Sequence, residues 1–97
     1  NITMKDLLIN ARKLIANKKN WLSVRGVGPR DVTKLTLQEA VIRCSFDYRN
    51  NKTIFSFLER FTDGKTLHQF NDDMEHKDVL KVLDQAIEFL EEQEQSD

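Results

Sequence analysis

The longest regular apolar pattern in this chain lies in the segment from Thr66 to Leu90. Its apolar residues recur at the spacings of one face of an α-helix, and they are Val79, Leu80, Leu83, Ala86, Ile87 and Leu90. Side chains at such spacings line one side of a helix, and Val82 and Phe89 widen that side. We therefore expect a long helix that packs against two neighbouring elements, with the rest of the fold organised around it.

Shorter helical patterns precede this segment and predict helices over about residues 3–18, 37–49 and 53–61. The first follows a Thr3–Asp6 pair and the second a Thr36–Glu39 pair. At this spacing the threonine hydroxyl accepts from a free backbone N–H of the first turn, which predicts a helix start after each threonine. The third helix is expected to stop before Gly64, because glycine readily adopts the left-handed conformation that follows a helix end.

Two further features are expected to shape the corners of the fold. Thr66 is predicted to cap a single helical turn, after which Asp72 or Asp73 caps the long last helix. Trp21 lies in a short stretch that alternates apolar and polar residues, but no second segment has the pattern of a partner strand. This favours an extended loop that places the indole ring in the core.

The fold class predicted from these patterns is mainly α, a compact single domain of four to five short helices, with an extended Trp-containing loop after the first helix. A chain of 97 residues suffices for one domain with one core. The acidic end, residues 91–97, has no apolar face and is expected to fray. Met4 is a candidate native start, with residues 1–3 as additions before it.

Composition narrows the classes to which the chain can belong. Hydrophobic residues make up 39% and charged residues 32%, which fits a folded globular protein and argues against disorder. No apolar run approaches the ~20 residues of a membrane-spanning helix, and no basic-then-apolar leader opens the chain. A single cysteine, Cys44, excludes an internal disulfide. These features predict a cytoplasmic protein with no membrane partner.

The net charge of −1 hides a strong asymmetry. Residues 1–60 hold 12 lysines and arginines against 5 acidic residues, whereas residues 61–97 hold 3 against 11. One interpretation is that the two halves pack together and neutralise each other. The other is a basic face for an acidic partner. The candidate basic patch consists of Lys18, Lys19, Arg30, Lys34, Arg43 and Arg49, and Arg25 is a further binding candidate close to Trp21.

The two histidines raise the question of a metal site. In one continuous helix, His68, Asp72 and His76 would share a face at metal-binding spacing. Asn71 and the two acidic residues after it compete for their own backbone, however, and favour a break in the helix here. We therefore predict capping and hydrogen-bonding roles for these side chains, with no metal ion and no other cofactor.

Cys44 lies on the apolar side of its predicted helix, where a buried thiol is favoured over a nucleophile activated by a histidine. The alternative is a small-ligand site, which would form if Trp21, Cys44 and Asn71 converged. Apolar walls with a few polar groups are typical of such pockets. Asp72, next to Asn71, would then supply a further polar group.

Three stretches of the chain resemble parts of a known family. LLINARKLIANKKNWLSVRGV, AVIRCSFDYRN and FNDDMEHKDVLKVLDQAI resemble, in this order, a small domain-of-unknown-function family found in bacteria and their phages. The matching features are an L-x-x-A-x-x-L-I helix that runs into Trp21, Cys44 on a middle helix, and Phe70-Asn71-Asp72 before a V-L-x-x-L-D-x-A helix. The resemblance implies a helical fold and a phage or bacterial cytosolic origin. It brings no established activity, cofactor or ligand.

The sequence therefore favours a non-enzymatic accessory or host-interaction protein, encoded by a phage, that binds a macromolecular partner and in the first place a protein. One alternative is a nucleic-acid-binding protein that uses the basic N-terminal half. A second is a small-ligand binder or enzyme centred on Cys44, Asn71 and Asp72, with His68 nearby in sequence. Self-association through surplus aromatic surface is a further alternative.

Overall fold

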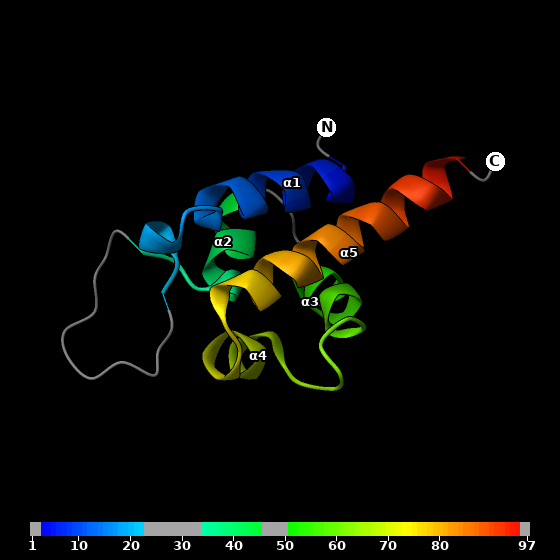
Figure 1. Cartoon of the computed structure of the whole chain (residues 1–97). Helices are drawn as coiled ribbons and strands as arrows, with labels where there is room; N and C mark the ends of the chain where they lie inside the picture. Colours follow the sequence, from blue (N-terminus) through cyan, green and yellow to red (C-terminus); the bar gives the residue numbers. More distant parts are fainter. Residues whose placement is uncertain (1–2, 23–33, 46–50, 96–97) are drawn as a thin grey trace.

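The protein is described here by a computed structural model that covers residues 3–22, 34–45 and 51–95. Within these ranges the helical elements are α1 (Met4–Ile15), the 3₁₀-helix η1 (Lys18–Asn20), α2 (Leu37–Cys44), α3 (Asn51–Glu59), α4 (Leu67–Asp73) and α5 (His76–Gln95). Trp21 and Leu35 form an isolated parallel β-bridge. The prediction of a mainly α single domain is confirmed (Figure 1).

The long helix α5 packs against more than one neighbour, as its apolar pattern predicts, but not every helix docks on it, because α2 packs on α1 and α4 instead. α1 lies alongside it and runs in the opposite direction, and α3 and α4 contact it as well (Figure 1). Val79 and Leu83 are fully buried, and Ile87 is half-buried against the same core. The width of the apolar face therefore reflects contact with more than one neighbouring helix.

The rest of the core comes from one face of each shorter helix. Its fully buried members before α4 are Leu7, Leu8, Ala11, Ile15, Leu37, Ala40, Val41, Ile54 and Leu58. α2 packs on α1 through these residues, and the Trp21 ring lies at the end of the same cluster with 9% of its surface exposed. The indole is thus in the core, as predicted.

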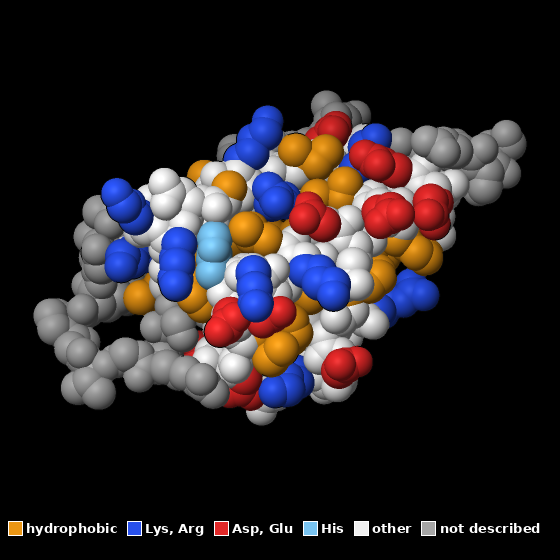
Figure 2. All heavy atoms as spheres, in the orientation of Figure 1, with side chains coloured by type: hydrophobic (Ala, Val, Ile, Leu, Met, Phe, Trp, Pro, Cys, Tyr) orange, Lys and Arg blue, Asp and Glu red, His pale blue; other side chains and the backbone are white. Residues whose placement is uncertain are grey.

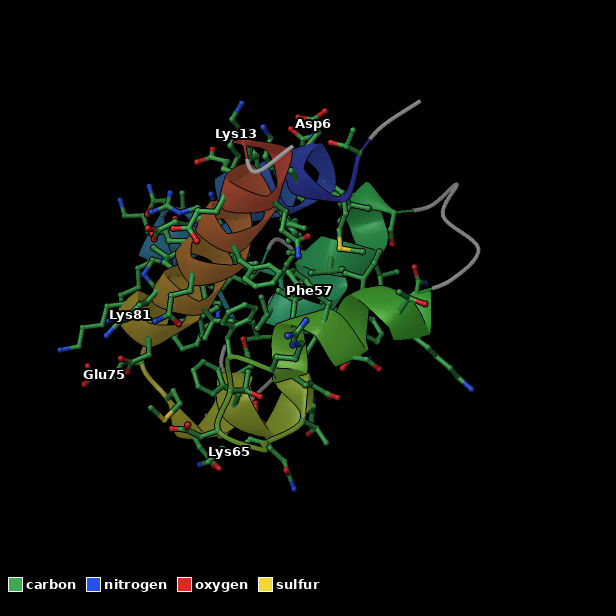
Figure 3. The ribbon with its side chains drawn as sticks, turned by 90° about the vertical axis from the view of Figure 1, so that its right-hand side faces the viewer. Asp6, Lys13, Phe57, Lys65, Glu75 and Lys81 are labelled. Carbon is green, nitrogen blue, oxygen red and sulfur yellow. The ribbon has the colours of Figure 1, made fainter. Side chains whose placement is uncertain are left out.

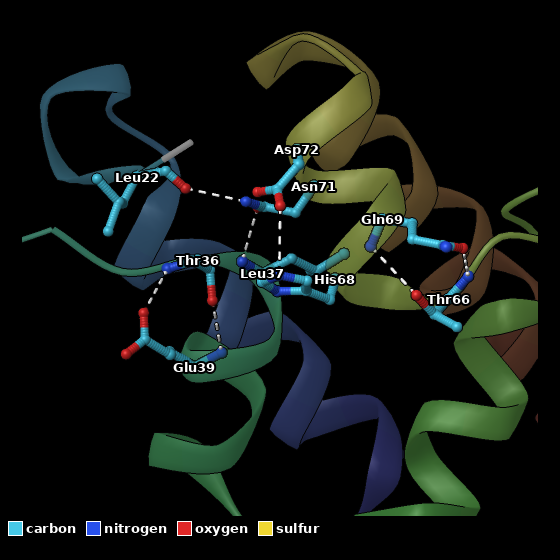
Figure 4. A network of polar contacts seen from close by, with 9 residues as sticks. All are labelled: Leu22, Thr36, Leu37, Glu39, Thr66, His68, Gln69, Asn71 and Asp72. Atoms are coloured by element: carbon cyan, nitrogen blue, oxygen red, sulfur yellow. Dashed lines mark hydrogen bonds and ion pairs between the residues drawn. The ribbon is translucent and has the colours of Figure 1, made fainter. Parts of the chain in front are cut away.

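Threonine side chains begin three of the helices. Thr3 accepts from the Asp6 N–H at 3.1 Å, and Thr36 forms a full capping box with Glu39, with both bonds at 3.1 Å. Thr66 forms a second capping box with Gln69 at 3.2 and 3.4 Å (Figure 4). These bonds satisfy backbone N–H groups of the first turn, which have no partner inside the helix. The helix starts predicted at the three threonines are confirmed.

The polar run after Phe70 does not break the helix where the sequence pattern predicts. Asn71, Asp72 and Asp73 form the last turn of α4, and the break falls at Met74, whose backbone is extended. The prediction that Asp72 or Asp73 caps the last helix is therefore wrong. α5 begins at His76, and the Glu75 N–H before it donates to the Asp78 carboxylate at 3.1 Å. The Asn71 side chain does not compete for the backbone of its own helix, because it is hydrogen-bonded to groups that are distant in sequence.

Several helix ends also differ from their predicted positions. α1 stops at Ile15 because Asn17 begins a separate 3₁₀ turn, where its side chain accepts from the Lys19 N–H at 3.0 Å. α5 continues through residues 91–95, beyond the predicted start of a frayed tail, since glutamate and glutamine are good helix formers. Gly64 adopts the expected left-handed φ of +83°, but α3 already ends at Glu59, so the glycine lies in a later turn with Asp63 and does not directly follow the helix end.

None of the described helices combines the length and the apolar character that are needed to cross a lipid bilayer.

Candidate functional site

Asn71 is a buried polar residue that ties three parts of the chain together. Its Oδ1 accepts from the Trp21 Nε1–H at 2.7 Å and from the Leu37 N–H at 2.9 Å, and its Nδ2 donates to the Leu22 carbonyl at 2.9 Å. Figure 4 shows Asn71 between the extended segment at Leu22 and the first turn of α2. The side chain is fully buried, and these bonds make it a structural link between α4, α2 and the Trp21 segment.

Asp72 points to a different partner from its neighbour. Its Oδ2 lies 3.3 Å from His68 Nε2, one turn earlier on α4, and the His68 side chain is 60% exposed. His76 lies beyond the break after α4, and its Nε2 is 2.6 Å from the Ile15 carbonyl oxygen. The helix break thus separates His76 from the other two, and in the described ranges no group of three such side chains has the arrangement of a metal site.

A hollow of about 390 Å³ lies at the junction of η1, α4 and α5. It is lined by Lys18, Trp21, Asp72, Met74, Glu75, His76 and Lys77. The Trp21 and His76 rings lie together with centroids 5.4 Å apart, and two cations and two carboxylates surround them. Because the indole N–H is already bonded to Asn71, the polar groups that a ligand would meet are the charged side chains at the rim.

Three of the predicted basic residues come together at one end of the molecule. Lys18 and Lys19 lie in η1, and the chain at Lys34 returns beside η1, because the Leu35 N–H donates to the Asn20 carbonyl at 2.8 Å. We call these three lysines the basic end. Figure 2 shows lysine and arginine side chains over this part of the surface and carboxylates toward the C-terminal half of α5.

The other members of the predicted patch do not extend the basic end. Arg43 lies in the last turn of α2, away from η1. Arg25, Arg30 and Arg49 fall outside the described residues. The contiguous part of the predicted patch therefore consists of the three lysines.

Cys44 does not join Trp21 and Asn71. Leu37, which is bonded to Asn71, begins α2, whereas Cys44 ends it, and at ~1.5 Å per residue this places the thiol about 10 Å further along the helix axis. Trp21 and Asn71 therefore come together, but Cys44 does not join them to form the predicted small-ligand site. Burial raises the pKa of the Cys44 thiol, and the nearby Arg43 opposes this with a smaller lowering effect.

The raised pKa predicts a poorly reactive thiol. At mildly alkaline pH the folded protein should hold less thiolate at Cys44 than the unfolded chain does, because its pKa is higher in the folded state. We expect iodoacetamide to label the native protein more slowly than the urea-unfolded protein, with a native rate that keeps rising at higher pH. Arg43→Gln should slow native labelling further, because it removes the cation that favours thiolate. A native rate equal to the unfolded rate would contradict this.

A second surface feature was only partly predicted by the sequence. Phe57, Phe61 and Phe89 are half-buried and form a ring cluster between α3 and α5. The signal for it was present in the pattern, since Phe89 lies at the edge of the apolar stripe of α5. The sequence gives no sign that Arg60 covers two of these rings.

Comparisons of the chain with protein-family models, with curated proteins and with solved structures gave no match.

Proposed function

We propose that the protein is a non-enzymatic accessory protein that binds an acidic surface of another protein through its basic end. One observation carries the proposal: within the described ranges, no carboxylate lies in ion-pair contact with any of the three lysines. Lys18 and Lys19 are exposed. Cations without an ion pair among the described residues are available to an external carboxylate, and they steer association with an acidic surface.

Two cations elsewhere on the chain are paired with carboxylates, in contrast to the lysines of the basic end. Arg12 on α1 lies 2.6 Å from the Asp84 carboxylate on α5, so the basic and acidic halves neutralise each other along this line. Lys65 pairs with Asp73 at 3.0 Å. Packing thus consumes part of the charge asymmetry of the sequence, whereas the three lysines of the basic end keep no carboxylate in ion-pair contact within the described ranges.

The low exposure of Trp21 favours a protein partner over a single-stranded nucleic acid. Binding of single strands depends on aromatic faces on which bases can stack. Trp21 is 9% exposed and its N–H is bonded to Asn71, so its ring offers little surface for stacking.

An enzymatic role gains no support from Cys44, whose thiol is half-buried and remote from Asn71. We further propose a phage or bacterial cytosolic origin, and this part of the proposal is supported by the sequence resemblance alone.

Reversal of the charge at the basic end should abolish partner binding. The test compares the wild type, a Lys18→Glu/Lys19→Glu variant and a Lys52→Glu/Lys81→Glu control as baits in nuclease-treated bacterial lysate. All four lysines are exposed, and both variants change the net charge equally. We expect a protein retained by the wild type and the control, with recovery reduced about tenfold or more by the first variant, since like charges then meet at the interface.

The outcomes separate the proposal from its rivals. The proposal would be contradicted if no protein showed this pattern of retention at either ~0.05 or ~0.15 M salt. A partner that is retained from a parallel untreated lysate but lost from the nuclease-treated one would point to nucleic acid. In that case a labelled single-stranded oligonucleotide should bind with an affinity that falls steeply with salt.

A further inference from the structure

A second hollow, remote from the basic end, lies between the end of α3 and the outer side of α5. It has a volume of about 240 Å³ and is lined by Phe61, Gln85, Glu88, Phe89 and Glu92, and we call it the acidic groove. Figure 3 looks toward this side and places Phe57 between α3 and α5. Its chemistry is the opposite of that at the basic end.

The floor of the acidic groove is aromatic. The Phe57, Phe61 and Phe89 rings contact one another with centroid separations of 5.5, 5.7 and 6.2 Å, and none of the three is fully buried. The Arg60 guanidinium lies 5.3 Å from the centre of the Phe89 ring and 6.0 Å from that of Phe57. These ring faces therefore already hold a cation, which is the contact expected of electron-rich aromatic faces.

The rim of the acidic groove on α5 is negative. Glu88 and Glu92 are one helical turn apart, both are exposed, and both line the groove with Gln85. In the part of the chain that the structure describes, neither carboxylate has a lysine or arginine in ion-pair contact. On the aromatic side of the groove, the described contacts identify one cation, Arg60. Its guanidinium lies over the Phe57 ring of α3 and the Phe89 ring of α5.

We propose that the acidic groove binds a cationic amphipathic helix from another protein. A bulky aliphatic side chain of that helix packs against Phe61 and Phe89, and its lysine or arginine side chains meet Glu88 and Glu92. Apolar contact at the centre with complementary charge at the rim is how amphipathic helices dock in grooves. The charge of the rim selects a cationic partner and disfavours an acidic one.

The test uses a labelled amphipathic peptide of leucine and lysine, about four helical turns long, and measures its fluorescence anisotropy with the full chain. Two comparison peptides keep the same length, one with glutamate in place of lysine and one with alanine in place of leucine. The protein variants are Glu92→Lys and Glu91→Lys, which change the net charge equally at adjacent exposed positions, of which only Glu92 lines the groove.

We expect saturable binding of the leucine–lysine peptide, weakened about tenfold or more by Glu92→Lys and less than threefold by Glu91→Lys. Both comparison peptides should bind at least tenfold more weakly. Equal loss in the two variants would reduce the effect to general charge attraction and overturn the proposal, as would absence of binding. Sedimentation velocity of the protein alone checks the other occupant: a dimer that Glu92→Lys dissociates would assign the groove to a second copy of this chain and also overturn the proposal.

Discussion

Replacement of Asn71 by leucine is expected to lower the free energy of unfolding by about 3–5 kcal/mol. The leucine side chain has a similar volume but can neither accept nor donate. The Trp21 Nε1–H and the Leu37 N–H would lose their acceptor, and the Leu22 carbonyl its donor. Each buried group left without a partner costs about 1–3 kcal/mol, because water cannot replace the lost bond. Urea denaturation followed by circular dichroism measures the change.

Two comparison variants make this prediction specific. Trp21→Phe removes one donor and leaves the Leu37 bond of Asn71 in place, so its loss should be smaller than that of Asn71→Leu. Asp72→Asn alters the next side chain on α4, which is only half-buried, and should change stability by less than ~1 kcal/mol. If Asn71→Leu cost no more than Trp21→Phe, the bonds to Leu37 and Leu22 would contribute nothing.

Asn71 also illustrates why part of this fold could not be predicted from sequence. The periodicity of apolar residues and the threonine caps are local signals, and they located the described parts of α1, α2, α3 and α5. The partners of Asn71 are 34, 49 and 50 residues away along the chain. Local chemistry alone favours a break at Asn71, because an asparagine without a distant partner competes for its own backbone. The tertiary bonds remove that competition, and α4 continues past it.

The candidate surfaces were predictable to a similar extent. Lys18 and Lys19 are neighbours in sequence, so their proximity needed no structure. Lys34 joins them only through the pairing of Leu35 with Asn20, which depends on how the chain returns from the segment between them. The acidic groove requires α3 to lie against the outer side of α5, and helical periodicity gives the face of each helix without its neighbour. The distribution of charged residues along the sequence therefore indicated one basic and one acidic surface, and the packing of the helices decided where each surface lies.

Leu83→Ala is expected to cost about 2–5 kcal/mol of the free energy of unfolding. Leu83 is fully buried on the inner side of α5, where α1 and α3 both contact the helix. Removal of the isobutyl group loses its transfer free energy and leaves a cavity that helices packed on several sides cannot close. Urea denaturation of the full chain gives the loss, provided that the slope with denaturant stays the same.

Gln85→Ala is the matched control, since Gln85 lies two residues further along α5 and is exposed. Alanine has the higher helix propensity, so this variant should change stability by no more than ~0.5 kcal/mol. A large loss in Leu83→Ala alone would mean that stability depends on the buried face of α5 and that helix formation by itself contributes little. Equal small effects in both variants would mean that α1, α2 and α3 hold together without α5, and the long helix would then be an appendage of the fold.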